Sequence, residues 1–98
     1  LQVYSPTFTT QTITSPSDGS IGVTTSPTLS WGSQGNAKSY DVQVAADINF
    51  NTIIKLANTT ETSYALTGLN EATTYYWRVR PVNPCVNGAY SIAAAFAT

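Results

Sequence analysis

The stretch that decides the fold is Tyr75-Tyr76-Trp77-Arg78-Val79-Arg80, and Leu69 stands six residues before its first tyrosine. Every second residue of the stretch is large and apolar, as in a β-strand with one buried face. A leucine in a loop, followed by a tyrosine two places before a large apolar residue, is the pattern of a tyrosine corner. In such a corner the phenol hydroxyl bonds to the backbone of the preceding loop. The stretch therefore predicts a crossover between two packed β-sheets, and nothing in it is catalytic.

Six further segments have the length and alternation of strands. With the strand at Tyr75–Val82, the predicted strands are Gln11–Thr14, Thr28–Trp31, Ser39–Ala46, Thr52–Ala57, Ser63–Leu66 and Tyr90–Phe96. In the last of them we expect Ile92, Ala94 and Phe96 to point inward. Pro81 has no backbone N–H, so we expect pairing on its side to stop or bulge there. Seven short strands with a two-residue period and no helical period predict an all-β sandwich.

The two tryptophans of the chain are assigned to the middle of this sandwich. Antibody-type domains carry a cysteine two residues after the corner tyrosine, bonded across to the other sheet. Trp77 occupies that position here, and the chain has a single cysteine, which excludes an internal disulfide. Each buried indole removes on the order of 200 Å² from water. We therefore expect Trp31 and Trp77 to fill the space that a disulfide would bridge.

With these features the sequence resembles the fibronectin type III family. The matching pieces are Pro27-x-Leu29-x-Trp31, Tyr40-x-Val42-x-Val44 and Leu69-x-Glu71-x-Thr73-x-Tyr75-x-Trp77-x-Val79. A bacterial subgroup is matched further by 18–23, 42–45, Asp47-x-x-Phe50, 76–79 and Phe96-x-Thr98. The resemblance implies a seven-stranded immunoglobulin-like β-sandwich with the structural signature Trp31, Tyr40, Leu69, Tyr75 and Trp77. Ala72 stands where many members carry proline or glycine, so we expect a less rigid loop there.

The resemblance covers roughly residues 14–98, and residues 1–13 are interpreted as a linker and the end of a preceding domain. Similar modules follow catalytic domains in secreted bacterial peptidases and polysaccharide-degrading enzymes, or lie along surface proteins. This implies a non-catalytic accessory or spacer module of a secreted or surface bacterial multidomain protein, attached to a hydrolase such as a peptidase. Its partners would be the neighbouring domains of the same chain. The alternative is a module that binds extracellular glycan or protein. No Arg-Gly-Asp triplet occurs, so the adhesion known from some animal members is not implied.

Composition excludes several functions. The four basic residues cannot form the phosphate-neutralising stripe of a nucleic-acid-binding protein. No apolar run approaches the roughly 20 residues of a membrane span, so no membrane insertion is expected. Histidine is absent, and the five carboxylates are scattered through turns and outward positions, so we predict neither an enzyme nor a cofactor. Charged residues make up only 9% of the chain, against about 25% in ordinary proteins. Threonine, serine and asparagine supply the polar surface instead, which suits a secreted or cell-surface protein.

Two regions are candidates for contact with a partner. Tyr76, Arg78 and Arg80 form an outward stripe, which we expect beside Asp41 and Gln43 of the neighbouring strand. Such a stripe is explained either by cross-strand pairing or by a tyrosine–arginine contact patch.

The second region is the loop 83–88, which contains Asn83 and Asn87 as possible contact residues. Cys85 in this loop is either a partly shielded small apolar residue or the site of a disulfide to a neighbouring domain or copy.

One further segment imitates a known site. Asp47-x-Asn49-x-Asn51 resembles the start of a calcium-binding loop, but threonine and asparagine stand where its glycine and bidentate glutamate are needed. We therefore interpret the segment as a polar turn, with Phe50 folding back onto the edge of the core, and predict no metal.

Overall fold

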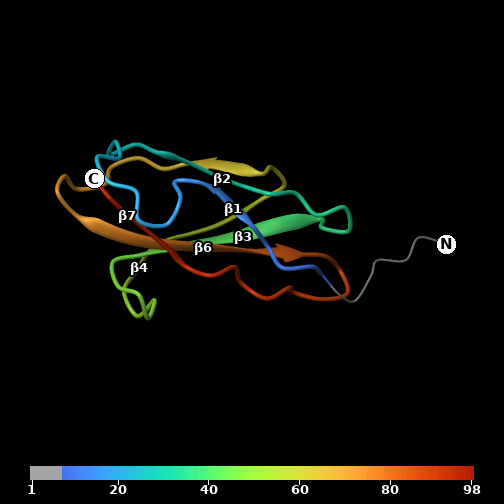
Figure 1. Ribbon diagram of the computed structural model, residues 1–98. Helices are drawn as coiled ribbons and strands as arrows, with labels where there is room; N and C mark the ends of the chain where they lie inside the picture. The colour runs from blue at the N-terminus through green and yellow to red at the C-terminus, as the bar shows by residue number, and fades with distance from the viewer. Residues whose placement is uncertain (1–7) are drawn as a thin grey trace.

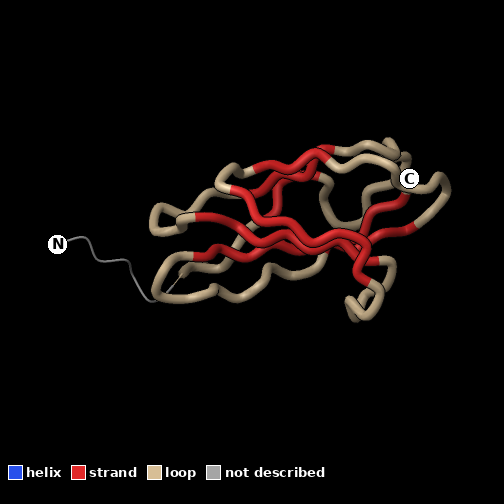
Figure 2. Tube along the Cα trace, turned by 180° about the vertical axis from the view of Figure 1, so that it is seen from behind, coloured by secondary structure: helices blue, strands red, loops and turns tan. Residues whose placement is uncertain are grey.

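The computed structural model describes residues 8–98, which form two antiparallel β-sheets packed face to face (Figures 1 and 2). The strands are β1 (Ile13–Ser15), β2 (Thr28–Trp31), β3 (Ser39–Ala45), β4 (Ile53–Thr59), β5 (Ser63–Ala65), β6 (Thr74–Val82) and β7 (Ala94–Ala97). The smaller sheet has the order β1-β2-β5, and the larger has the order β4-β3-β6-β7. This confirms the predicted immunoglobulin-like sandwich. None of the described residues forms a helix that could cross a membrane.

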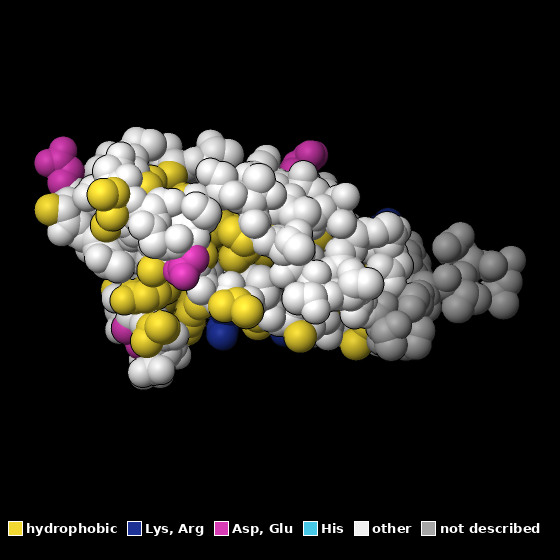
Figure 3. All heavy atoms as spheres, in the orientation of Figure 1, with side chains coloured by type: hydrophobic (Ala, Val, Ile, Leu, Met, Phe, Trp, Pro, Cys, Tyr) yellow, Lys and Arg dark blue, Asp and Glu magenta, His cyan; other side chains and the backbone are white. Residues whose placement is uncertain are grey.

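The two central strands of the larger sheet, β3 and β6, show the clean alternation that the sequence predicts. Tyr40, Val42 and Val44 of β3 are buried, and the residues between them are half-exposed. In β6 the buried positions include Trp77 and Val79. Both strands have a neighbour on each side and a core on one face, so a two-residue period follows directly. Charged side chains are sparse on the face seen in Figure 3, as the composition predicts.

Two indoles occupy the middle of the core. Trp31 is 4% exposed and Trp77 is fully buried, and their ring centres lie 6.2 Å apart. Tyr40 packs against Trp31 at 5.8 Å. The Trp77 Nε1–H donates a hydrogen bond to the carbonyl of Pro16 at 3.3 Å. The predicted tryptophan core, which replaces the inter-sheet disulfide of antibody-type domains, is therefore confirmed.

The tyrosine corner has the predicted geometry. The buried Tyr75 hydroxyl accepts a hydrogen bond from the Asn70 amide at 2.8 Å, and Leu69 packs against the core. Ala72, in the same loop, has a φ of 51°, a left-handed conformation that glycine adopts without steric cost. A second hydrogen bond from a loop amide to a tyrosine hydroxyl was not predicted. The Tyr40 hydroxyl accepts the Gln34 amide of the β2–β3 turn at 2.8 Å.

The segment before β1 is part of the sandwich. The side chain of Gln11 is buried, and its Nε2 donates to the carbonyl of Gly32 at 2.6 Å. Thr9 bonds through its amide and hydroxyl to the Gln34 side chain. β1 therefore starts later than predicted: Thr9 and Gln11 are tied to the β2–β3 turn by side-chain bonds, and the Thr12 carbonyl accepts the Gly32 amide at 3.2 Å just before the strand begins. The rest of the predicted linker, residues 1–7, lies outside the described residues.

The chain leading into β7 differs from the prediction. Trp77 of β6 pairs with Ala94, and the next contact along β6 is Val79, whose carbonyl accepts the Ser91 amide at 2.8 Å. The Val79 amide in turn donates to the Ser91 hydroxyl at 3.2 Å. Two steps along β6 thus match three steps along the other chain, which is the geometry of a β-bulge.

The extra residue reverses the alternation before β7. Ser91 is buried, whereas Ile92 is 87% exposed. The predictions that the strand begins at Tyr90 and that Ile92 faces the core are therefore wrong. Beyond the bulge the pattern holds, and Ala94 and Phe96 are buried as predicted.

Pairing beside Pro81 differs from the expectation. Regular pairing on its side already ends at Trp77 and the bulge lies between Trp77 and Val79, so neither is located at the proline. The Pro81 carbonyl still accepts a hydrogen bond from the Gly88 amide at 2.7 Å, because only the donor is missing in proline.

The corner hydroxyl can be tested by Tyr75→Phe, which keeps the ring in the core. We expect this variant to lower the free energy of unfolding by about 1–2 kcal/mol, because the Asn70 amide loses its acceptor. Tyr76→Phe is the matched control, since the Tyr76 hydroxyl makes no hydrogen bond within residues 8–98. Urea denaturation measures both variants. An equal loss in the two would contradict the role of the corner bond.

The bulge can be tested by Ile92→Ser. We expect the free energy of unfolding to stay within about 0.5 kcal/mol of the parent, because the side chain is exposed. Phe96→Ala, four residues further along the chain, should lower the free energy of unfolding by about 3–5 kcal/mol, because the Phe96 side chain is buried. A loss of several kcal/mol in Ile92→Ser would mean that the alternation continues unbroken into the core.

Candidate functional site on the outer face of the larger sheet

The outer face of the larger sheet carries two rows of side chains across three strands. The antiparallel register aligns Leu56, Gln43 and Arg78 in one row and Asn58, Asp41 and Arg80 in the next. Both rows point away from the core, because the residues between them on β3 and β6 are buried. The predicted placement of the arginines beside Asp41 and Gln43 is confirmed.

Asp41 is held from both neighbouring strands. Its carboxylate accepts a hydrogen bond from the Arg80 Nε at 2.9 Å and another from the Asn58 Nδ2 at 2.8 Å. The two ion-pair side chains are 28% and 26% exposed. A pair this accessible contributes about 0–1 kcal/mol to stability. Its main effect is therefore to fix the direction of the Arg80 side chain.

Arg78 is held more tightly. Its Nε donates to the Gln43 side-chain oxygen at 2.7 Å. The guanidinium carbon lies 4.1 Å from the ring centre of Phe50 and 4.4 Å from that of Tyr90. Two aromatic contacts therefore position the guanidinium plane, and cation–π attraction stabilises the arrangement.

The loop that presents Phe50 is the one that resembles a calcium-binding segment. The Asp47 carboxylate accepts the amides of Thr52 at 2.8 Å and Asn51 at 3.2 Å. The Thr52 hydrogen bond is the main reason why the pKa of Asp47 lies below its ordinary value. Phe50 adopts a φ of 56° and is 9% exposed. The loop is thus a polar turn that folds Phe50 back, as predicted. Within residues 8–98, no cluster of three or more acidic or cysteine side chains is placed to hold a metal.

Tyr90 is the residue of this face that the sequence did not reveal. Its ring centre lies 4.4 Å from the guanidinium carbon of Arg78 and 4.8 Å from that of Arg80. Burial raises the pKa of Tyr90 above its ordinary value of 10.0, and the charge of Arg80 opposes that shift. Unbroken alternation from Phe96 would place Tyr90 on the inner face. The bulge that moves it outward lies between Trp77 and Val79 and not at Pro81, so the proline does not mark its position in the sequence.

In the second predicted contact region, the loop 83–88, Asn83 and Asn87 have different environments. The Asn83 side chain is 5% exposed and is used inside its own loop: its oxygen accepts the amides of Cys85 at 2.8 Å and Val86 at 3.0 Å. Its Nδ2 donates to the carbonyl of Asn36 at 3.1 Å. Asn87 and Cys85 are exposed. Asn83 therefore supports the loop from within, and Asn87 remains the predicted contact residue.

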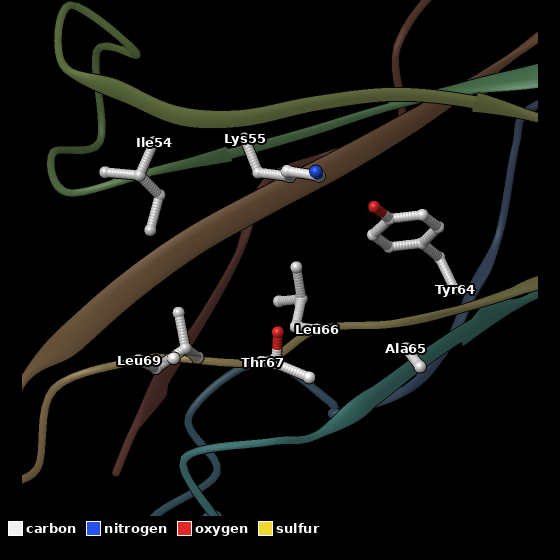
Figure 4. A pocket seen from close by; sticks show the side chains of 8 residues that line it. Ile54, Lys55, Tyr64, Ala65, Leu66, Thr67 and Leu69 are labelled. Carbon is white, nitrogen blue, oxygen red and sulfur yellow. The ribbon is translucent and has the colours of Figure 1, made fainter.

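Two hollows are relevant to ligand binding. One, of about 400 Å³, lies on the outer face and is lined by Asp41, Gln43, Leu56, Ala57, Asn58, Arg80 and Tyr90. The other, of about 190 Å³, lies at the side of the sandwich where the edge strands β4 and β5 meet. Figure 4 shows Leu66 in the middle of this side hollow, with the amine of Lys55 pointing toward the Tyr64 ring. The side hollow is smaller than ordinary ligand sites of about 300–1,000 Å³. Of these two hollows, the one on the outer face is therefore the better candidate, and a further hollow of about 520 Å³ lies beside the loop 83–88.

The role of Tyr90 can be tested with two variants. Tyr90→Ala loses both ring contacts, so we expect a loss of about 1–2 kcal/mol in the free energy of unfolding at neutral pH. Tyr90→Phe keeps the ring and should match the parent there.

Measurements at alkaline pH distinguish the contribution of the Tyr90 hydroxyl to stability from that of its ring. Tyr90 in the folded state holds its proton to higher pH than in the unfolded chain, whose pKa is about 10. Its stabilising contribution is complete below about pH 10 and is lost as pH rises through the folded-state pKa. We expect Tyr90→Phe to lose less stability than the parent above about pH 10 in urea denaturation. An equal loss of stability in Tyr90→Phe and in the parent at alkaline pH would contradict the burial of this hydroxyl.

Comparison with known proteins agrees with this architecture. The family model described as "Fibronectin type III domain" matches residues 9–96. A crystal structure of an Fn3-like protein from Clostridium thermocellum is 26% identical, with a TM-score of 0.67 over 93% of this chain and 91% of that one.

The sixth fibronectin type III domain of the human fibronectin type III domain containing protein 3 is also similar in fold. It is 20% identical, with a TM-score of 0.69 over 100% of this chain and 90% of that domain. A search of curated proteins finds no match. Because the family model spans nearly all of the sequence, the chain belongs to the fibronectin type III family.

Proposed function

We propose that this domain is a non-catalytic accessory or spacer module of a secreted or surface bacterial multidomain protein. Fibronectin type III domains are common modules of multidomain proteins. The similarity to a protein of Clostridium thermocellum supports a bacterial source. The weakly charged, Thr/Ser/Asn-rich surface supports an extracellular location. The neighbour that we propose is a hydrolase such as a peptidase, because the motifs of this sequence resemble those of modules attached to such enzymes.

The observation that carries the spacer proposal is the position of the two ends of the described chain. Thr9 is bonded to the β2–β3 turn through Gln34. At the far end, the Thr98 hydroxyl donates to the Asn70 carbonyl at 2.6 Å. β6 connects these regions, and its nine residues at about 3.3 Å each span roughly 30 Å. A domain tied down at both ends would hold its neighbours at a fixed separation.

The spacer proposal predicts a narrow distance between two flanking reporters. Residues 8–98 would be inserted between two spin-labelled reporter domains and compared with a flexible Gly/Ser chain of equal length. That chain has a root-mean-square span of about 50 Å with a broad distribution. We expect pulsed electron paramagnetic resonance to give a sharper and shorter distance for the folded domain. A distribution as broad as that of the flexible chain would contradict the proposal.

A second candidate function is supported by a specific observation on the outer face. Arg78 and Arg80 are both held in place, and within residues 8–98 their hydrogen bonds use only the Nε atoms. Binding of an extracellular glycan or protein through Tyr76, Arg78 and Arg80, or through the loop 83–88, is therefore our alternative proposal. Both tryptophans are buried, so neither provides an outward platform for a sugar ring.

A further inference from the structure

We propose that the outer face recognises an extended protein segment with two carboxylates spaced two residues apart, next to an apolar side chain. This inference rests on the second candidate function and is independent of the spacer function. The chemistry of the partner follows from the arrangement of Arg78 and Arg80 and from the exposed Leu56 in the same cross-strand row as Arg78.

Both arginines have N–H donors that remain available for a partner. A guanidinium has five N–H donors in a planar fork. Arg78 uses its Nε on Gln43, and Arg80 uses its Nε on Asp41, while the two terminal nitrogens of each make no hydrogen bond within residues 8–98. The acceptor that best fits such a fork is a carboxylate, which can take two parallel N–H···O bonds. Each arginine therefore offers a site for one carboxylate.

Both arginine side chains are ordered in the free domain. A free arginine side chain loses considerable rotamer freedom when it binds a partner. Here the Arg78 plane lies between Phe50 and Tyr90, and Arg80 lies against Tyr90 with its Nε fixed by Asp41. The two arginine side chains have therefore already lost much of their rotamer freedom in the folded domain, before a partner binds. The contacts that stabilise the sheet also prepare the two guanidiniums for binding.

The two arginines have a fixed spacing along β6. Arg78 and Arg80 are two residues apart on one face of β6, so they are about 6.6–6.8 Å apart along the strand. In an extended partner segment, acidic side chains at positions i and i+2 share one face and have the same spacing. Neighbouring carboxylates at i and i+1 would point to opposite faces. The register of the sheet thus favours a Glu-x-Glu pattern.

An exposed leucine beside the arginines favours a protein partner over a polysaccharide. Leu56 stands in the same row as Arg78 and is 62% exposed, and it forms a wall of the outer hollow together with Tyr90. An exposed leucine gains free energy by contact with an apolar side chain, which an acidic polysaccharide lacks. Tyrosine and arginine are also the types enriched at protein-binding hot spots. These features favour an acidic peptide segment.

The test uses three blocked peptides that differ only in their acidic positions and carry the leucine on the same face as the two positions of the Glu-x-Glu pattern: Thr-Glu-Thr-Glu-Thr-Leu, Thr-Gln-Thr-Gln-Thr-Leu and Thr-Glu-Glu-Thr-Thr-Leu. Calorimetric titration of the domain would measure each affinity. We expect the first to bind and the other two to be weaker by at least about tenfold, because one lacks charge and the other lacks the spacing. Raising the salt concentration should weaken the first peptide.

Variants of the domain locate the site. Arg78→Lys and Arg80→Lys keep the charge but lose the fork, and each should weaken the first peptide by at least about tenfold. Lys55→Gln is the matched control: it removes a charge from the side hollow, and binding should be unchanged. Thermal unfolding of each variant would verify that it is folded.

Three results would overturn the inference. They are equal binding of the Glu-x-Glu and Glu-Glu peptides, no effect of either lysine variant, and no binding of any peptide at millimolar concentration. Polygalacturonate is tested in parallel, and tighter Arg78-dependent binding of this polymer would make the face a polysaccharide site instead. None of these results would affect the distance between reporters that tests the spacer function.

Discussion

The contact between Trp31 and Trp77 is the interaction on which the rest of the structure depends. It joins the two sheets at their centre, where related architectures use a disulfide. Trp77 also bonds to the Pro16 carbonyl and so fixes the chain that leaves β1. The single cysteine excludes an internal disulfide, and the ion pair found within residues 8–98, Arg80–Asp41, lies inside one sheet and does not join the two. Burial of aromatic area therefore takes that role.

The buried face of β6 also determines what its outer face can do. Once Trp77 and Val79 are fixed in the core, Arg78 and Arg80 must point outward with the period of the strand. The pairing with β3 then sets their partners, Gln43 and Asp41. Cross-strand pairing and partner binding are thus not competing explanations of this surface. The same hydrogen bonds and ring contacts order the arginines in the free domain.

The sequence predicted best those elements whose residues are fixed by local alternation against one core. The corner tyrosine, both tryptophans and the central strands β3 and β6 belong to this group. Prediction failed where a distant contact overrides the local pattern. Gln11 is buried through a bond to Gly32, and the bulge opposite Val79 moves Ile92 to solvent and Tyr90 to the outer face.

In the candidate site, too, features set by local alternation were predicted and features set by distant contacts were not. Placement of the arginines beside Asp41 and Gln43 followed from the alternation of two neighbouring strands. The aromatic contacts did not, because Phe50 comes from a loop with a left-handed residue and Tyr90 from beyond the bulge. Both depend on backbone geometry that a two-residue period does not contain.

The segment that follows β1 gives the domain a mechanical property. Ser20 pairs with Phe96 in a parallel arrangement, and bonds of 2.8–3.0 Å tie Gly19 and Val23 to Ala95 and Ala97 of β7. Tension applied through the chain would pull this segment and β7 in opposite directions along their length. Parallel neighbours loaded in this way are sheared, so their hydrogen bonds share the force and must break together instead of one after another. Resistance to stretching would then be set by this short ladder and by the rate at which it opens, not by the equilibrium stability of the sandwich.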